Sequence, residues 1–204
     1  MTTNPNLPNR IFYTGVPGSR WSGIAQWLER VVPGFNISDR TAERTFGHCV
    51  AHPGLPAGHE GAYFGTGMEF KTELDDPTYI DKPWTESGGC RIIKSHEWAL
   101  QLDKIKELYP NDWIMLVYRP DEVSSAWWHT IGGFNIQYPK YDHYVDAIGM
   151  NNAIRLQNQA ILDFGKRHDA VWYQVSSRFL KDQFSVDADG LPDHFNDILI
   201  TVIK

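Results

Sequence analysis

The chain has 204 residues, of which 42% are hydrophobic and 22% are charged, and its formal net charge is −6. This size suits one substantial core, so we expect a single domain over residues 1–204. The negative charge excludes nucleic-acid binding through bulk electrostatics, and the lack of ~18 consecutive apolar residues excludes a membrane-spanning helix. In chain order, the first residues have no basic region followed by an apolar run, which predicts a cytoplasmic protein.

The first predicted unit is a strand, a glycine-rich turn and a helix. Residues 10–14 form an apolar and aromatic run typical of a strand, and Gly15 begins the turn. The apolar residues of the helical pattern that follows share one face: Ile24, Trp27, Leu28 and Val31. Pro33 and Gly34 end this helix. The order is typical of a phosphate-binding loop, because glycines let backbone amides approach an anion and the helix presents its positive end.

This turn carries the first set of candidate binding residues. They are Gly18, Ser19, Arg20, Trp21 and Ser22. Ser22 offers a hydroxyl in the first turn of the helix. Arg20 supplies a cation, and it is a candidate catalytic residue that would neutralise charge on the leaving oxygen of a transferred group. The segment is not a Walker A loop, since Arg20 and Trp21 stand where that motif has Gly and Lys, and this counts against ATP hydrolysis. A strand-to-helix turn that binds no ligand is the alternative interpretation of this segment alone.

Residues 36–87 are rich in Gly, Pro and His and predict connecting loops that could line a pocket for an acceptor. The histidines and cysteine of this region match no zinc motif, so we predict no metal site: His48, Cys49, His52 and His59. Glu69 lies in an aromatic, glycine-rich stretch, where it is either an auxiliary base or part of a plain loop. Cys90 and Cys49 have no CxxC partner and are read as ordinary thiols.

A second motif follows the short apolar strand predicted for residues 90–95. His96, at the end of this strand, is a candidate general base for an acceptor hydroxyl, and Lys94 is a candidate to stabilise charge on a bridging oxygen. A capping or core histidine is the alternative for His96. Helical spacing then extends over residues 98–108, with apolar residues on one side: Leu102, Ile105 and Leu108.

A third motif follows residues 113–118, a continuous apolar run that predicts a strand buried on both faces. Arg119 leaves this strand, and Ser124 and Ser125 follow on the next predicted helix. An arginine with nearby hydroxyls is a good cradle for a phosphate monoester. The alternative is an ion pair between Arg119 and one of the acidic residues that follow it, Asp121 or Glu122.

Further along, a helix is predicted over residues 141–168 and a strand over residues 170–175, while the tail from residue 181 shows no decisive pattern. The alternation of strands and helices predicts a three-layer α/β/α fold with a central, mainly parallel sheet. In such sheets ligands bind beyond the carboxyl ends of the strands. The segments 15–22, 94–96 and 119–125 are therefore expected to meet at one edge.

Together these motifs resemble the P-loop-related sulfotransferase family, including its cytosolic and tyrosylprotein branches. Residues 15–22 take the place of the family's loop for the 5′ phosphosulfate, and Lys94-Ser95-His96 matches its K-T-H motif, whose His is the catalytic base. Arg119, with the serines and the aromatic pair Trp127-Trp128 on the next helix, matches the site for the 3′ phosphate. Tyr173 matches a tyrosine that contacts the adenine.

The resemblance implies a nucleotide-binding fold of the P-loop type and 3′-phosphoadenosine 5′-phosphosulfate (PAPS) as donor, with PAP as product. The acceptor would be a small molecule, a peptide or a glycan. Two other classes stay open. Gly18 stands where the family has a catalytic Lys or Arg, and Arg20 where it has Gly, which leaves a PAP-binding module without catalysis. An ATP- and Mg²⁺-dependent small-molecule kinase is the third class.

Overall fold

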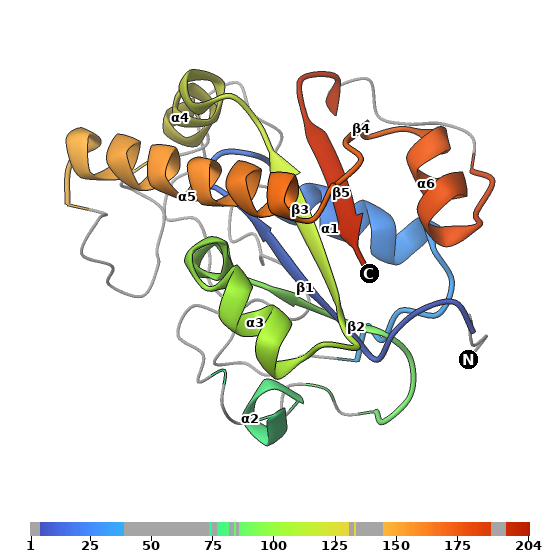
Figure 1. Ribbon diagram of the computed structural model, residues 1–204. Helices are drawn as coiled ribbons and strands as arrows, with labels where there is room; N and C mark the ends of the chain where they lie inside the picture. Colours follow the sequence, from blue (N-terminus) through green and yellow to red (C-terminus); the bar gives the residue numbers. More distant parts are fainter. Residues whose placement is uncertain are drawn as a thin grey trace.

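The computed structural model describes residues 5–38, 74, 77–81, 84, 86–130, 133, 145–188 and 195–204. These residues form a mixed α/β protein with a five-stranded sheet (Figure 1). In chain order the elements are β1 (Arg10–Gly15), α1 (Trp21–Val31), α2 (Pro77–Asp81), β2 (Arg91–Lys94), the 3-10 helix η3 (His96–Leu100), α3 (Leu102–Leu108), β3 (Trp113–Tyr118), α4 (Asp121–Thr130), α5 (Ala147–Arg167), β4 (Tyr173–Gln174), α6 (Ser177–Phe184) and β5 (Leu199–Ile203).

The strand order is β2-β1-β3-β5-β4. β1 lies between β2 and β3 and is parallel to both, with Phe12 aligned to Ile93 on one side and to Ile114 on the other. β5 is antiparallel to both of its neighbours, β3 and β4. The expected parallel sheet is thus found for β2, β1 and β3. The antiparallel β5 comes from the tail for which the sequence pattern was indecisive.

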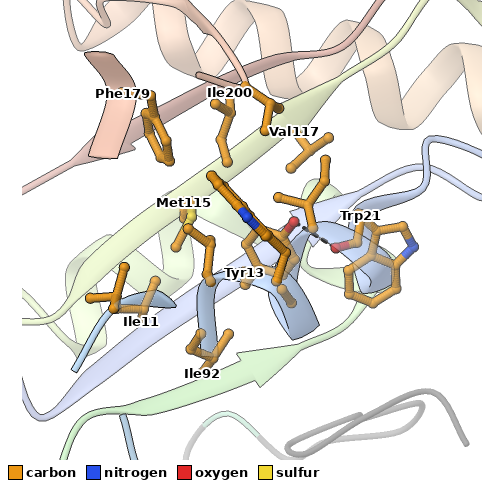
Figure 2. Close-up of a cluster of buried hydrophobic side chains, with 14 of the residues drawn as sticks. Ile11, Tyr13, Trp21, Ile92, Met115, Val117, Phe179 and Ile200 are labelled. Carbon is orange, nitrogen blue, oxygen red and sulfur yellow. Dashed lines mark hydrogen bonds between the residues drawn. The ribbon is translucent and has the colours of Figure 1, made fainter. Parts of the chain in front are cut away.

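Side chains of β1 alternate between two cores, one on each face of the sheet. Ile11 and Tyr13 face α1 and α6, whose buried side chains complete the first cluster (Figure 2). Phe12 faces η3, α3 and α5, which complete the second cluster. α1 and α6 accordingly lie on the side of the sheet opposite to α3 and α5 (Figure 1). Burial on both faces explains why β1 and β3 read as nearly continuous apolar runs.

Two elements differ from their expected extents. The helical pattern over residues 98–108 divides into η3 and α3 at Gln101, whose backbone has φ −127° and ψ 14°. Leu108, expected on the apolar side, is instead 41% exposed because it lies in the last turn of α3. The strand expected over residues 170–175 is reduced to β4, an edge strand that pairs only through Tyr173 and Gln174 with β5.

α5 is the longest helix of the described chain, with 21 residues, and it lies within the predicted range 141–168. It is capped by Asp146, whose carboxylate accepts from the amide of Gly149 at 2.7 Å. Its buried residues include Met150, Ile154 and Ile161, which face the second core. The exposed side is mostly polar but also carries Ile148 and Leu156. Among the helices described here, none is long and apolar enough to cross a membrane.

Candidate functional site

The carboxyl ends of the three parallel strands bring the three predicted segments into contact. The amide of Ser95, just after β2, donates to the carbonyl of Tyr13 in β1 at 3.1 Å. Nη1 of Arg119, just after β3, donates to the carbonyl of Gly18 at 3.0 Å. Segments 15–22, 94–96 and 119–125 therefore meet at one edge of the sheet, as expected for parallel neighbours.

The loop between β1 and α1 is a tight turn that packs against α4. The amide of Ser19 donates to the carbonyl of Val16 at 3.0 Å, and Gly18 has φ 79°, a left-handed conformation that favours glycine. A Cβ on Gly18 would lie 1.9 Å from the carbonyl oxygen of Ser124. Gly18 is therefore required by the close approach of two backbones, whatever the loop binds.

The N-terminus of α1 differs from those of the other longer helices. Arg20 occupies its N-cap in the left-handed region, with φ 62°, and makes no side-chain capping bond, and the first turn contains no acidic residue. Among the described α-helices of seven or more residues, the other four have a side-chain cap or an acidic residue in the first turn. The positive end of α1 is thus not compensated in this way, which favours a negative ligand.

The candidate residues at this end of α1 differ in burial and in their partners: Ser19, Trp21 and Ser22. The hydroxyl of Ser19 is buried and has no hydrogen-bond partner among the described residues, although a buried hydroxyl normally has one. Trp21 is buried, with its ring centroid 5.7 Å from that of Tyr13 and 6.3 Å from that of His96. Ser22 is half-buried in the first turn. Ser19 therefore places a polar group at this end of α1 for which the described protein atoms supply no hydrogen-bond partner.

Arg119 is 6% exposed and is held by Asp197, a residue that no sequence motif indicated. Nε and Nη2 of Arg119 both donate to Oδ2 of Asp197, at 2.9 and 2.7 Å. Among the described residues the ion pair of Arg119 is with Asp197 and not with Asp121 or Glu122, and Asp121 accepts from Nδ2 of Asn158 at 2.5 Å. Nδ2 of Asn158 also donates to the carbonyl of Arg119 at 2.8 Å, and this hydrogen bond fixes the backbone where the chain leaves β3.

The two predicted serines have protein partners. The hydroxyl of Ser124 is fully buried and donates to the carbonyl of Arg119 at 3.2 Å. The hydroxyl of Ser125 donates to Oδ1 of Asn151 in α5 at 2.6 Å. Both hydroxyls are thus engaged by protein atoms, and binding of a phosphate by either serine stays a prediction.

Arg20 lies close to Arg119 and shares an aromatic neighbour with it. The Cζ atoms of Arg20 and Arg119 are 4.4 and 5.8 Å from the ring centroid of Trp127, and Arg20 is also 5.1 Å from the ring of Phe195. Burial and the charge of Arg119 lower the pKa of Arg20, and the carboxylate of Asp197 acts in the opposite direction. Two guanidinium groups and one carboxylate thus gather around one indole.

His96 and Lys94 are both buried at the carboxyl end of β2, and both contact residues of α1. His96 is the first residue of η3, 3% exposed, and its carbonyl accepts from the hydroxyl of Thr14 at 3.5 Å. Nζ of Lys94 is paired with Oε1 of Glu29 at 3.0 Å. Glu29 lies eight residues after Trp21, about 12 Å along α1 at 1.5 Å per residue. Lys94 therefore holds α1 on the sheet, and its predicted contact with a bridging oxygen stays a prediction.

Tyr173 lies in β4, which is separated from β3 by β5 and so stands about 10 Å from it. Its ring packs 5.9 Å from that of Phe179, and its hydroxyl accepts from Nε2 of Gln183 at 3.3 Å. The structure places Tyr173 against α6 rather than beside Arg119.

Several other candidates lie outside the described residues: His48, Cys49, His52, His59 and Glu69. Cys90 is described and is a buried free thiol, whose pKa is raised chiefly by burial. In the described ranges, no group of three or more His, Cys, Asp or Glu residues is placed to hold a metal ion.

Comparisons with protein-family models, with curated proteins and with solved structures find no match to this chain. The functional conclusion therefore depends on the sequence motifs and on the arrangement of residues at this edge of the sheet.

Proposed function

We propose that this chain is a PAPS-dependent sulfotransferase with a three-layer nucleotide-binding fold of the P-loop type. The observation that carries the proposal is the hydrogen bond from Arg119 to the carbonyl of Gly18. It joins a cation that follows β3 to a glycine turn that precedes an uncapped helix. An anion bound at this junction would meet backbone amides, a helix N-terminus and a guanidinium group together.

The residues present fit a doubly phosphorylated donor. The N-terminus of α1, the buried hydroxyl of Ser19 and amides over residues 18–22, other than the Ser19 amide that donates to Val16, would hold the 5′ phosphosulfate. Arg119 would hold the 3′ phosphate through its planar fork of donors. When bound, the donor supplies an activated sulfuryl group.

His96 is the proposed general base. It lies at the carboxyl end of β2, beside the loop after β1, where its imidazole ring is near Trp21. An imidazole is neutral over much of the range near pH 7, so it can accept the proton of an acceptor hydroxyl or amine. The burial of His96 and Trp21 excludes water from this position, which limits loss of the reactive group to hydrolysis.

The test has a binding step and a transfer step. Calorimetry should show that the wild-type protein binds PAP more tightly than AMP or ATP, and without Mg²⁺. His96→Gln should keep PAP affinity within about twofold and lose transfer from PAPS to a panel of phenols, alcohols and amines, by at least about 100-fold. His168→Gln, at the exposed end of α5, is the matched control and should have wild-type activity.

Selective ATP binding that requires Mg²⁺ would favour the kinase alternative and would overturn the proposal. PAP binding without transfer to any acceptor would favour the PAP-binding module. The ion pair of Lys94 with Glu29 is the observation that favours this second candidate, because the predicted catalytic cation Lys94 is engaged by a carboxylate of α1. The acceptor class, whether small molecule, peptide or glycan, and the cytoplasmic location stay predictions.

A further inference from the structure

We infer that Glu97 and Leu100 form an acceptor subsite beside His96, and that this subsite takes an acceptor with a cationic amine on an apolar body. The inference rests on the proposed function, because it names the acceptor class of the site in which His96 is the proposed base. No sequence motif indicated either residue. Glu97 would bind the ammonium group, and Leu100 would cover part of the apolar body.

The first support is the arrangement of η3. Glu97 directly follows His96, so their Cα atoms lie about 3.8 Å apart. Side chains three residues apart in a 3-10 helix lie on the same side, and the rise is about 2.0 Å per residue. Glu97 and Leu100 therefore share one side of η3, about 6 Å apart along its axis. His96 and Ala99 share another side, so the subsite adjoins the base without taking its place.

The second support is the difference in exposure along η3. His96, Trp98 and Ala99 are at most 3% exposed. Leu100 is 60% exposed although it is a large apolar residue, and Glu97 is half-buried. η3 thus turns three side chains inward, and their packing fixes the helix. A carboxylate and an apolar group are left on a rigid element, where they can bind a ligand without a change in the core.

The third support is the state of the Glu97 carboxylate. It has no hydrogen bond or ion pair with the residues described here, and the nearest cation along the chain, Lys94, is paired with Glu29. Burial raises the pKa of Glu97, and no described cation acts in the opposite direction. A partly buried carboxylate is costly to ionise unless it is paired. An ammonium group would supply the missing charge through a charge-assisted hydrogen bond.

Stabilisation of η3 does not account for Glu97. The amide of Glu97 donates to Oγ of Ser95 at 3.1 Å, so the N-terminus of this helix already has a side-chain cap. η3 has only five residues, and an exposed acidic residue would serve its N-terminus without the cost of partial burial. The placement of this carboxylate is explained better by a cationic ligand.

The charge of the whole chain favours the same class of acceptor. With a formal net charge of −6, the field around the protein raises the local concentration of a cation and lowers that of an anion. Leu100 adds apolar surface that a purely ionic ligand would leave exposed. An aryl or alkyl amine with a hydroxyl group uses all three residues: the hydroxyl at His96, the ammonium at Glu97 and the hydrocarbon at Leu100.

The experiment compares three phenols that differ chiefly in charge: tyramine, 4-ethylphenol and 4-hydroxyphenylpropanoate. With PAPS as donor, the wild-type protein should have a kcat/KM for tyramine at least about tenfold above that for 4-ethylphenol, the effect of one charge-assisted contact, and the lowest value for the propanoate. This preference should weaken as NaCl is added, because salt screens a partly exposed pair.

Glu97→Gln should raise the KM for tyramine by about tenfold and leave its kcat, and both constants for 4-ethylphenol, within twofold. Leu100→Ser should raise the KM for tyramine and for 4-ethylphenol alike, by about threefold, because it removes apolar contact from both. Glu107→Gln, exposed in α3, is the matched control and should keep the wild-type preference.

Two outcomes overturn the inference while the proposed function stands. One is equal kcat/KM for tyramine and 4-ethylphenol in the wild-type protein. The other is an equal loss for all three phenols in Glu97→Gln with an unchanged urea midpoint, since Glu97 would then act on the base or on the loop and not on the charge of the acceptor.

Calorimetry with the phenols alone separates this inference from the proposed function. Tyramine that binds more tightly than 4-ethylphenol, with a preference lost in Glu97→Gln, supports the cation subsite even in a protein that neither binds PAP nor transfers from PAPS. That result would overturn the sulfotransferase proposal alone. PAP binding together with no binding of tyramine and no transfer to it would overturn the inference alone.

Discussion

The buried hydroxyl of Tyr13 donates to the carbonyl oxygen of Trp21 at 2.7 Å (Figure 2). Tyr13 lies in β1, just before the glycine turn, and Trp21 is the first residue of α1, just after it. This hydrogen bond therefore joins the two ends of the loop that carries the candidate anion site. It ties the loop's conformation to the centre of the sheet, where Tyr13 is surrounded by the first core cluster.

Tyr13→Phe should lower the free energy of unfolding by about 1–2 kcal/mol, since it leaves a buried carbonyl without this donor. Urea denaturation measures the change. Tyr118→Phe is the matched control on β3, because the hydroxyl of Tyr118 has no hydrogen bond with the residues described here. Equal losses in the two variants would show that the contact with Trp21 contributes no stability.

The same tyrosine should make stability fall at alkaline pH. Burial, together with the negative charge of Glu29, raises the pKa of Tyr13 well above its ordinary value of 10.0. The unfolded chain loses this proton near pH 10 while the folded chain keeps it, so the stabilising contribution is complete below pH 10 and is lost as the pH rises beyond it.

Unfolding free energies measured from pH 8 to pH 11 should consequently fall more steeply for the wild-type protein than for Tyr13→Phe. The difference in slope should approach about 1.4 kcal/mol per pH unit. Raised pKa values at Tyr118 and Cys90 affect both proteins, so the difference isolates Tyr13. Parallel curves would show that Tyr13 ionises alike in both states.

The ion pair between Lys94 and Glu29 gives a double-mutant cycle. The side chains are 0% and 11% exposed, so Lys94→Met leaves a largely buried carboxylate without its cation. This should lower the free energy of unfolding by about 3 kcal/mol, and Lys94→Met with Glu29→Gln should lose less than the sum of the single changes. Urea denaturation of the four proteins measures the coupling. Additive losses would mean that the two side chains do not interact in solution.

Gly18, in the loop after β1, and Gly23, in α1, differ in the space that a Cβ would have at each position. Gly18→Ala brings a Cβ to 1.9 Å from the carbonyl oxygen of Ser124 at a residue with φ 79°, so the loop or α4 must move. We expect a loss of more than about 2 kcal/mol in unfolding free energy, together with weaker PAP binding.

Gly23→Ala is the control, because a Cβ there meets nothing within 4 Å and the residue lies in α1. It should raise the unfolding free energy by up to about 1 kcal/mol through helix propensity. Thermal and urea unfolding measure both variants. A neutral Gly18→Ala would show that the loop does not approach α4 as closely as described.

Local patterns were sufficient to predict most of the elements around the site. The apolar run of β3, the 3.6-residue spacing of α1 and the glycine turn between β1 and α1 each lie within a few neighbouring residues. The rule that parallel strands share their carboxyl edge then places Gly18, His96 and Arg119 together. These features follow from the local order of residues and from the order of strands and helices, and both can be recognised in the sequence.

The side chains that pair with the candidate site residues could not be predicted from local sequence patterns. Asp197 lies 78 positions after Arg119, and Lys94 lies 65 positions after Glu29. β5 enters the sheet beside β3 and brings Asp197 to the edge where Arg119 emerges. The packing of α4 against the loop turns Arg20 toward Trp127. Ion pairs and ring contacts form between side chains that only the folding of distant segments brings together, so they depend on packing rather than on local periodicity.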